Sequence, residues 1–366
     1  TGPDRLYVFR DSRTGATQLV EVPEALDPQG RAKSPKKNEL VVTLKPDAKE
    51  SIDDLARRLG ARVVGRLDGL HAYRLEFENG DAADAARAAL AENSDVSGIE
   101  ENAGIARPEI PPIQAAGATP VLNLRPRPLT EGSPVVVGLI DTPVQTEGTV
   151  LQGFLLPGIA VAGDSAMDPG QLSHGSAMAQ TILYALAKSS EGASGTPVRI
   201  LPVDVYGGSA STTTFQLAQG IYEAINAGAA IVNLSLGGES ESPLLQSIIQ
   251  AGAAQGVVFL AATGNQPVTT PVYPAAYSEV IAVTATGGNG EVAPYANRGD
   301  FVDAAAPGTS VVPFNGQSYV VVGTSTATAH ASAYAAHIMA TTGQQGSALD
   351  AQVRQSLGIS PPSVKP

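Results

Sequence analysis

The stretch VVVGLID, residues 135–141, is an unbroken apolar run that ends abruptly on a carboxylate. Such runs are typical of strands buried on both faces of a parallel sheet, where neither side of the strand meets water. Four more runs repeat this pattern further along the chain: VRILPVDVY (198–206), AIVNLSL (230–236), VVFLAATG (257–264) and VIAVTAT (280–286). Helical patterns lie between them, as in 213–228 and 242–255. The sequence therefore predicts a three-layer αβα domain with a mainly parallel sheet.

In open α/β sheets, ligands bind where the strands end at their carboxyl edge, so the residues after 135–141 matter for function. A dinucleotide fold would require G-x-G-x-x-G at this point. The chain has Asp141-Thr142-Pro143 instead, and this tripeptide would clash with a pyrophosphate. Dinucleotide binding is therefore excluded as the function of this sheet.

The composition changes about one third of the way along the chain. Residues 1–108 hold 16 Lys/Arg and 19 Asp/Glu, whereas residues 109–366 hold only 7 and 16. The proline-rich stretch 106–120 lies at the change and predicts an extended linker. We expect four parts: an N-terminal extension (1–38), a small domain (39–105), a linker with the start of the following part (106–132), and a large domain (133–366).

The small domain has its own order of predicted strands and helices. Four strand patterns and two helical ones follow one another between residues 39 and 102 in the order βαββαβ. This order predicts an α+β ferredoxin-like sheet with both helices on one face, a topology that hosts many functions. Before it, residues 1–38 predict a hairpin of LYVFR and TQLVEV followed by a polar connector.

Composition excludes several classes of function. The chain has no cysteine, which rules out disulfides and thiol nucleophiles, and its net charge of −12 argues against nucleic acid as a partner. No run of 18 apolar residues occurs, so we expect no membrane span. The chain opens with Thr1 and no signal peptide, and the lack of cysteine suits an exported protein. We therefore expect a secreted or periplasmic location.

Four polar residues stand at abrupt ends of strands or starts of helices: Asp141, His174, Asn265 and Ser325. Each has a plain structural interpretation: Asp141 and Asn265 as turn or loop residues, and His174 and Ser325 as helix caps. Together, however, they supply the parts of one reaction. A serine hydroxyl needs an imidazole to take its proton, the imidazole needs a carboxylate, and the oxyanion needs an amide donor.

At this point the sequence resembles the subtilisin-like serine proteases, or subtilases. Four collinear blocks carry the resemblance: VVVGLIDTPV around Asp141, SHGSAMA around His174, NLSLGG with AATGNQ up to Asn265, and GTSTATAH around Ser325. The resemblance implies a serine endopeptidase with the triad Asp141, His174 and Ser325, with Asn265 as oxyanion donor and with no cofactor. Its substrates would be proteins or peptides.

The chain departs from the family pattern at three places. Pro143 and Ser176 replace the usual Gly and Thr of the acid and base blocks, and Ala329 stands where proline commonly precedes the helix histidine. The change at Ala329 keeps one alternative open, a relative in which an amine intercepts the acyl-enzyme and a peptide bond is formed. A catalytically silent peptide-binding protein with the same fold is a second alternative.

The resemblance also implies where a substrate would bind. In the family a peptide adds as a strand between two enzyme segments. The residues that correspond in this chain are Ala210, Ser211, Thr212, Ser235, Leu236, Gly237, Gly264 and Val272. Val272 falls at the base of the pocket for the residue before the scissile bond, which predicts a preference for small or medium apolar residues. The loop after the His174 helix lacks the acidic ligand set of a calcium site, so we expect no metal.

The 39–102 unit resembles a subtilase propeptide. In the family this domain packs against the protease, assists its folding and leaves its C-terminal tail in the cleft. The resemblance therefore implies that the chain is a zymogen and that its own N-terminal domain is an intramolecular inhibitor. It also implies self-cleavage near 103–112, a stretch that contains three prolines. An unrelated accessory domain is the alternative.

Overall fold

The computed structural model describes residues 37–108, 113, 115, 119–128, 132–163, 167–190 and 195–359, together with the backbone of 6–10 and 17–21. The turn predicted between the first two strands and the polar connector after them lie outside these residues. So do parts of the proline-rich linker and of the loop that follows the His174 helix. In the described part of the chain, no helix has an apolar stretch of the length that a bilayer requires.

A seven-stranded parallel sheet forms the centre of the large domain, in the order β15-β14-β13-β12-β8-β10-β9. Its strands are β8 (Val135–Asp141), β9 (Ile159–Ala160), β10 (Val198–Asp204), β12 (Ile231–Leu234), β13 (Val258–Ala262), β14 (Val280–Thr286) and β15 (Ala304–Pro307). The five predicted apolar runs all occur in this sheet, and their residues are almost entirely buried. Asp141 at the end of β8 pairs with Asp204 at the end of β10, so these carboxyl ends share one edge.

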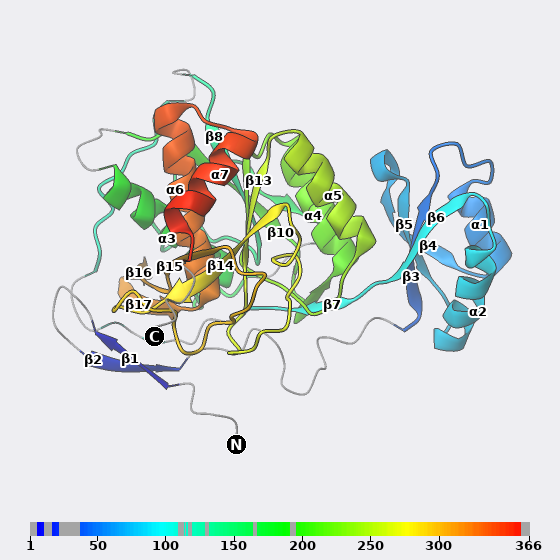
Figure 1. The fold of residues 1–366 in the computed structure, drawn as a ribbon, viewed down its shortest axis with the longest axis horizontal. Coiled ribbons are helices and arrows are strands. Elements are labelled where there is room, and N and C mark those ends of the chain that lie inside the picture. Colours follow the sequence, from blue (N-terminus) through cyan, green and yellow to red (C-terminus); the bar gives the residue numbers. More distant parts are fainter. Residues whose placement is uncertain are drawn as a thin grey trace, which may run out of the picture.

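Helices cover both faces of the sheet. One face carries α3 (His174–Ser189), α6 (Thr324–Thr342) and α7 (Gly346–Leu357), and the other carries α4 (Thr214–Asn226) and α5 (Pro243–Ala254) (Figure 1). Residues of β8 point alternately to the two faces of the sheet. Val137 and Leu139 pack with the core of α3 and α6, and Ile140 packs with that of α4 and α5. The predicted three-layer α/β architecture is confirmed.

Helix α6 is made almost wholly of small residues because it is enclosed. From residue 324 to residue 340 none of its side chains is exposed, and it packs against α3 and the sheet. A helix that is buried over most of its circumference needs little amphipathic pattern, and alanine and threonine allow close approach. A hairpin leads into it, formed by β16 (Thr309–Phe314) and β17 (Gln317–Val322).

The N-terminal domain has the predicted βαββαβ order. Its elements are β3 (Glu39–Leu44), α1 (Ile52–Leu59), β4 (Arg62–Leu67), β5 (Ala72–Glu76), α2 (Gly80–Ala91) and β6 (Val96–Glu101), with a short 3₁₀ turn at Asp68–Leu70. The strands form an antiparallel sheet in the order β4-β5-β3-β6. Further towards the N-terminus, β1 (Leu6–Arg10) and β2 (Thr17–Glu21) pair antiparallel, as predicted.

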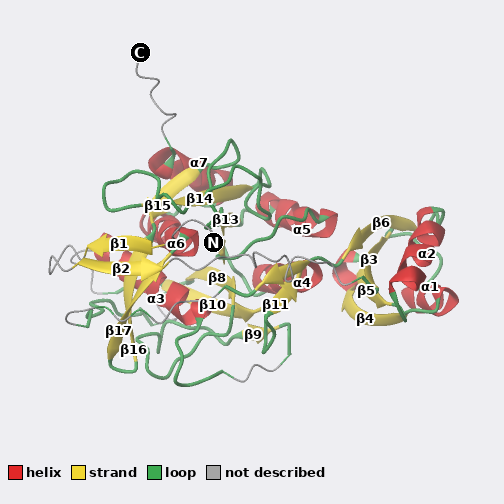
Figure 2. Ribbon diagram, turned by 90° about the horizontal axis from the view of Figure 1, so that it is seen from below, coloured by secondary structure: helices red, strands yellow, loops and turns green. Residues whose placement is uncertain are grey.

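The two faces of this small sheet contact different partners. Leu40 and Val42 pack on α1 and α2, whereas Val41 faces the other way and joins the core that contains Phe215 of α4. A Cβ at Gly65 would lie only 2.7 Å from the Phe215 ring, so a larger residue there would push the domains apart. Figures 1 and 2 show the small domain lying beside α4 and α5.

Two side chains of the small domain bond to backbone N–H groups at the starts of α4 and α5. The side-chain oxygen of Asn102 accepts a hydrogen bond from the Phe215 N–H at 3.2 Å. The Glu100 carboxylate accepts the Ser242 hydroxyl proton at 2.7 Å and the Leu244 N–H at 3.1 Å. The first N–H groups of a helix have no partner inside the helix and carry partial positive charge. Docking of the small domain therefore supplies hydrogen-bond acceptors to backbone N–H groups that have no partner within α4 or α5.

The Glu100 contact makes docking depend on pH. Burial raises the pKa of the Glu100 carboxyl above its ordinary value, although the bonds from Ser242 and Leu244 oppose this. The docked domain then binds a proton more readily than the undocked one. Acidification towards the raised pKa therefore favours docking through this group, and raising the pH through it removes that gain.

We predict that the melting temperature of wild type minus that of Glu100→Gln increases as the pH falls from about 7 to about 4.5. Thermal unfolding of both full-length chains at several pH values measures this difference. Glu92→Gln, at an exposed glutamate of the same domain, serves as the matched background. A difference between wild type and Glu100→Gln that is constant, or that grows with rising pH, would contradict the prediction.

Candidate active site

Asp141 and His174 form a buried pair at the carboxyl edge of the sheet. Asp141 is the last residue of β8 and His174 is the first of α3. The His174 Nδ1 lies 2.8 Å from Asp141 Oδ1 and 2.9 Å from Oδ2, and both side chains are buried. The Thr142 N–H also donates to Oδ1, at 2.6 Å. With Nδ1 held by a carboxylate, the remaining ring nitrogen, Nε2, is placed to accept a proton.

The start of α3 is fixed by its neighbours in the sequence. Ser173 caps the helix by accepting the Ser176 N–H, so the cap interpretation of His174 is wrong. The Gly175 N–H donates to the Thr142 hydroxyl at 2.8 Å. A Cβ at Gly175 would overlap the carbonyl oxygen of Thr142, so only glycine allows this approach. These contacts bring the base block against the acid block.

Ser325 is the second residue of α6, and it does not cap this helix. The cap position is Gly323, which has no side chain and whose φ is 150°. The Ser325 hydroxyl donates instead to the backbone carbonyl of Ser235 at 3.0 Å. Among the described residues, no hydrogen bond joins this hydroxyl to His174. The structure thus places the acid beside the base, but it turns the hydroxyl of Ser325 towards Ser235.

Asn265 is oriented by Thr324, the neighbour of Ser325. Its side-chain oxygen accepts the Thr324 N–H at 2.8 Å and the Thr324 hydroxyl at 3.0 Å. The amide nitrogen is the other end of the group, and it faces Gly323, where a Cβ would lie 3.0 Å away. Thr324 therefore helps to orient the amide, a role that the sequence analysis missed. Its place between Gly323 and Ser325 was the available signal.

A buried chain of hydrogen bonds supports the segment after β12. Ser332 of α6 donates to the side-chain oxygen of Asn233, whose amide donates to the Ser235 hydroxyl, both at 2.9 Å. The Ser235 hydroxyl in turn donates to the Ser325 carbonyl at 3.1 Å. Asn233 and Ser332 were also missed, because nothing in the sequence shows that residues 99 positions apart are partners.

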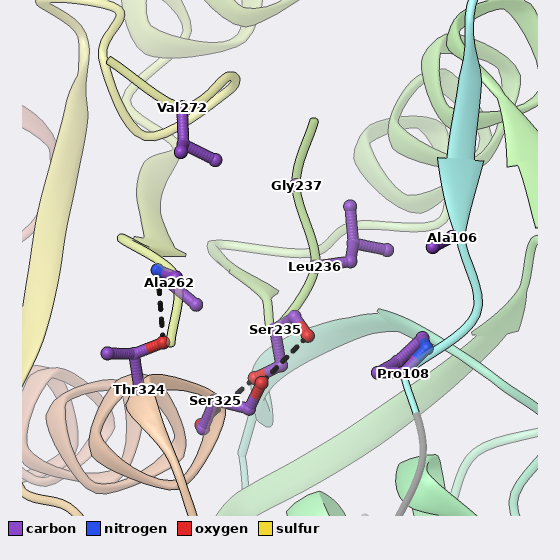
Figure 3. A pocket seen from close by; sticks show the side chains of 10 residues that line it. Ala106, Pro108, Ser235, Leu236, Gly237, Ala262, Val272, Thr324 and Ser325 are labelled. Carbon is purple, nitrogen blue, oxygen red and sulfur yellow. Dashed lines mark hydrogen bonds between the residues drawn. The ribbon is translucent and has the colours of Figure 1, made fainter. Parts of the chain in front are cut away.

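The predicted substrate residues fall into two groups. Five of them line one pocket together with Ser325: Ser235, Leu236, Gly237, Gly264 and Val272. Figure 3 shows Ser235, Leu236, Gly237 and Val272 around Ser325. Thr324 and Ala262 complete its wall, and Ala106 and Pro108 line it from the N-terminal side. Val272 is buried against Gly237, where a Cβ would lie 2.7 Å from its methyl group.

The other three, Ala210, Ser211 and Thr212, lie along an antiparallel strand pair. Their strand is β11 (Ser211–Thr213), and its partner is β7 (Gly104–Ala106), the segment that leaves the N-terminal domain. Beyond the strands, the Arg107 N–H donates to the Ala210 carbonyl at 2.9 Å. The Tyr206 hydroxyl donates to the Ala106 carbonyl at 3.0 Å. The chain's own linker thus occupies this side of the groove.

No group of three or more His, Asp or Glu side chains within the described ranges is arranged to hold a metal ion. This finding does not cover residues 191–194, which belong to the loop where the sequence lacks calcium ligands.

Comparison with known proteins matches both domains. Residues 132–357 match the model of the subtilase family, and residues 18–102 match that of the fervidolysin N-terminal prodomain. Thermitase of Thermoactinomyces vulgaris is 33% identical over 232 residues, which cover 62% of this chain and 82% of thermitase. The minor extracellular protease Epr of Bacillus subtilis is 42% identical over 120 residues, covering 32% of this chain and 19% of Epr.

A solved structure shares the fold over most of this chain. Fervidolysin from Fervidobacterium pennivorans, a keratinolytic enzyme related to subtilisin, superposes with a TM-score of 0.68 at 20% identity. The match covers 91% of this chain but only 58% of fervidolysin, so it shows the fold alone. The family matches go further, because they span most of both domains. The chain belongs to the subtilase family of serine proteases and carries a fervidolysin-type N-terminal prodomain.

Proposed function

We propose that this chain is the precursor of a subtilase endopeptidase in which Ser325 is the nucleophile, His174 the base and Asp141 its carboxylate partner. The observation that carries the proposal is the buried 2.8 Å contact between His174 Nδ1 and Asp141. It orients the imidazole and stabilises the imidazolium that forms when Nε2 takes a proton. A buried pair of this kind has little value for stability alone, because two polar groups must be desolvated.

The proposed reaction begins when the Ser325 hydroxyl leaves Ser235 and passes its proton to His174 Nε2. The oxygen attacks the carbonyl carbon of the substrate. The oxyanion that forms accepts hydrogen bonds from the Asn265 side-chain amide and from the Ser325 backbone N–H. Ser325 lies in the first turn of α6, where backbone N–H groups lack helical partners and the helix dipole favours negative charge. His174 then protonates the leaving amine, and water hydrolyses the acyl-enzyme.

A protein or peptide substrate would bind as an extended strand between β11 and the segment Ser235–Gly237. The pairing of β7 with β11 supports this mode, because it shows that β11 accepts an antiparallel strand. The same pairing supports an inhibitory role for the N-terminal domain, since its tail occupies the place that a substrate needs. Linkage within one chain raises the effective concentration of that tail to about millimolar.

We also infer a location outside the cytoplasm. The similarity to Epr, whose name describes an extracellular protease, and the absence of cysteine support it. Recovery of the processed chain only from the cytoplasm of the producing cell would contradict this inference.

A fluorophosphonate probe tests the nucleophile. We expect prolonged treatment to label wild type at Ser325 and the label to be lost in Ser325→Ala, because the probe reacts only with an activated serine. Ser278→Ala, at an exposed serine, is the matched control and should label like wild type. Product masses from a peptide substrate then separate hydrolysis from peptide-bond formation. Absence of label from wild type would favour the silent peptide-binding alternative.

Asn265 and Thr324 should act as one unit. Asn265→Ala should lower kcat of the active enzyme by about 10²–10³ with little change in KM, the loss known for the corresponding donor of subtilisin. Thr324→Val should lower kcat in the same way but less, about tenfold, because it leaves the amide without its hydroxyl partner. Thr324→Ser should restore the rate. If Thr324→Val lowers kcat as much in the Asn265→Ala background as in wild type, Thr324 does not act through Asn265.

Val272 should limit the size of the residue accepted before the scissile bond. We expect the wild-type enzyme to prefer small or medium apolar residues and Val272→Gly to shift this preference towards large ones, because the methyl groups at the pocket wall are removed. Cleavage profiling with a peptide library measures the shift. Val268→Gly removes an exposed valine nearby and should leave the profile unchanged. A wild-type preference for Phe, Tyr or Lys would refute the assignment of Val272.

A further inference from the structure

The segment that leaves the N-terminal domain is held in a definite register against β11. Ala103 accepts the Thr214 N–H and Arg107 donates to the Ala210 carbonyl, each at 2.9 Å. In an antiparallel pair, residues with polar groups turned to the partner alternate with residues whose groups point away. Residues 103, 105 and 107 therefore bond to the β11 segment, whereas the Ala106 carbonyl accepts the Tyr206 hydroxyl. The alternation turns the backbone of residue 108 away from β11.

The opposite side of the groove is the one that contains Ser235 and Ser325. Ala106 and Pro108 line the same pocket as these two serines, as Figure 3 shows. A substrate residue at position 108 would direct its N–H towards this side, where the Ser235 carbonyl lies. Proline has no N–H to give. The Ser235 carbonyl instead accepts the proton of the Ser325 hydroxyl, at 3.0 Å.

This bond has a direct consequence for the nucleophile. A serine hydroxyl has a single proton, so the proton given to Ser235 is not shared with His174. Within the described part of the chain, His174 Nε2 makes no hydrogen bond, while Nδ1 is held by Asp141. The base is thus oriented, but the hydroxyl that it would deprotonate points elsewhere.

Arg107 holds Pro108 in this place. Its guanidinium donates to the carbonyls of Gly207 at 2.8 Å and Ser209 at 3.2 Å, and it lies over the Tyr206 ring at 5.9 Å. The Tyr206 hydroxyl secures the preceding residue by donating to the Ala106 carbonyl. The contacts of Arg107 and Tyr206 therefore hold the tail in place, and none of them involves Ser325.

We propose that Pro108 makes the segment 104–108 a self-bound inhibitor that the active site does not cut. Pro108 withholds the N–H that a cleavable residue would give to Ser235, and the proton of Ser325 takes its place. This inference rests on the proposed function, since it assigns a regulatory role to the same site. It also implies that the N-terminal domain stays covalently attached until another event displaces the tail.

Replacement of Pro108 by alanine should reverse this state. The new N–H can donate to the Ser235 carbonyl and compete there with the Ser325 hydroxyl. A hydroxyl that turns away from Ser235 can give its proton to His174 Nε2. The Ser325 oxygen can then bond to the carbonyl carbon of residue 108, and the bond from that carbon to the nitrogen of residue 109 breaks as this nitrogen takes the proton from His174. Water releases the acyl group, so that the products are residues 1–108 and residues 109–366. Alanine also suits a pocket narrowed by Val272.

The experiment compares four full-length chains: wild type, Pro108→Ala, Pro128→Ala and Pro108→Ala with Ser325→Ala. Pro128 is an exposed proline further along the linker and serves as the matched control. Intact mass and N-terminal sequencing follow cleavage over time at several protein concentrations, and the rate of fluorophosphonate labelling follows the state of Ser325. We expect only Pro108→Ala to be cut after residue 108, at a rate independent of concentration. It should also label about tenfold faster than wild type, the factor that one ordinary hydrogen bond is worth.

The outcomes separate this inference from the proposed function. Wild type that cuts itself after Pro108 overturns the inference, and so does a Pro108→Ala chain that is labelled at Ser325 no faster than wild type and stays intact. In both cases Ser325 is still shown to be a nucleophile. Absence of label from every chain overturns the proposed function itself, and the inference with it. Cleavage of the Pro108→Ala, Ser325→Ala chain would reveal a contaminating protease and remove the support for self-processing.

Discussion

The structure depends on the parallel alignment of β8 with its neighbours, which places the carboxyl ends of several strands along one edge. A strand buried on both faces needs a hydrogen-bond partner for every polar side chain within it, and the unpaired edge is where a functional group is accessible; Asp141 is the last residue of β8. The starts of α3 and α6 lie on the same side of the sheet, and they bring His174 and Ser325 to this region. The packing of strands and helices therefore sets the positions of the proposed active-site groups, because each of them stands where a buried element begins or ends.

The N-terminal domain uses the other face of the molecule and the same principle. The starts of α4 and α5 present backbone N–H groups, and Asn102 and Glu100 bond to them from outside. Apolar contacts around Phe215 add area to the interface, and Gly65 permits the close approach. The strand β6 that carries Glu100 continues directly into β7, so the groups that dock the domain also set the register of its tail. Docking and occupation of the groove are therefore a single event.

Much of this was predictable from the sequence, and the failures have identifiable causes. Buried strands such as β8 and β13 gave long apolar runs, and the blocks around Asp141 and His174 belong to residues that the structure brings into contact. The catalytic roles of Asn265 and Ser325 stay predictions. The short strand β15 was missed because its alanines carry no strand preference. The β16–β17 hairpin was missed although its turn is Asn315-Gly316, both with positive φ. The bond from Ser325 to Ser235 was beyond reach, because it joins residues 90 positions apart and depends on what else occupies the groove.

Helix α6 has one more consequence, for the variation that the chain can tolerate. Most surface helices have a fully exposed side on which substitutions are nearly neutral, but before its last turn α6 has only a narrow stripe of partly exposed residues, among them His330, Tyr334 and His337. At its buried positions, each added methyl group would have to displace α3 or the sheet, and each lost one would leave a void. Sequence drift in this family member should thus be slow at the buried positions of α6, including those many residues away from Ser325.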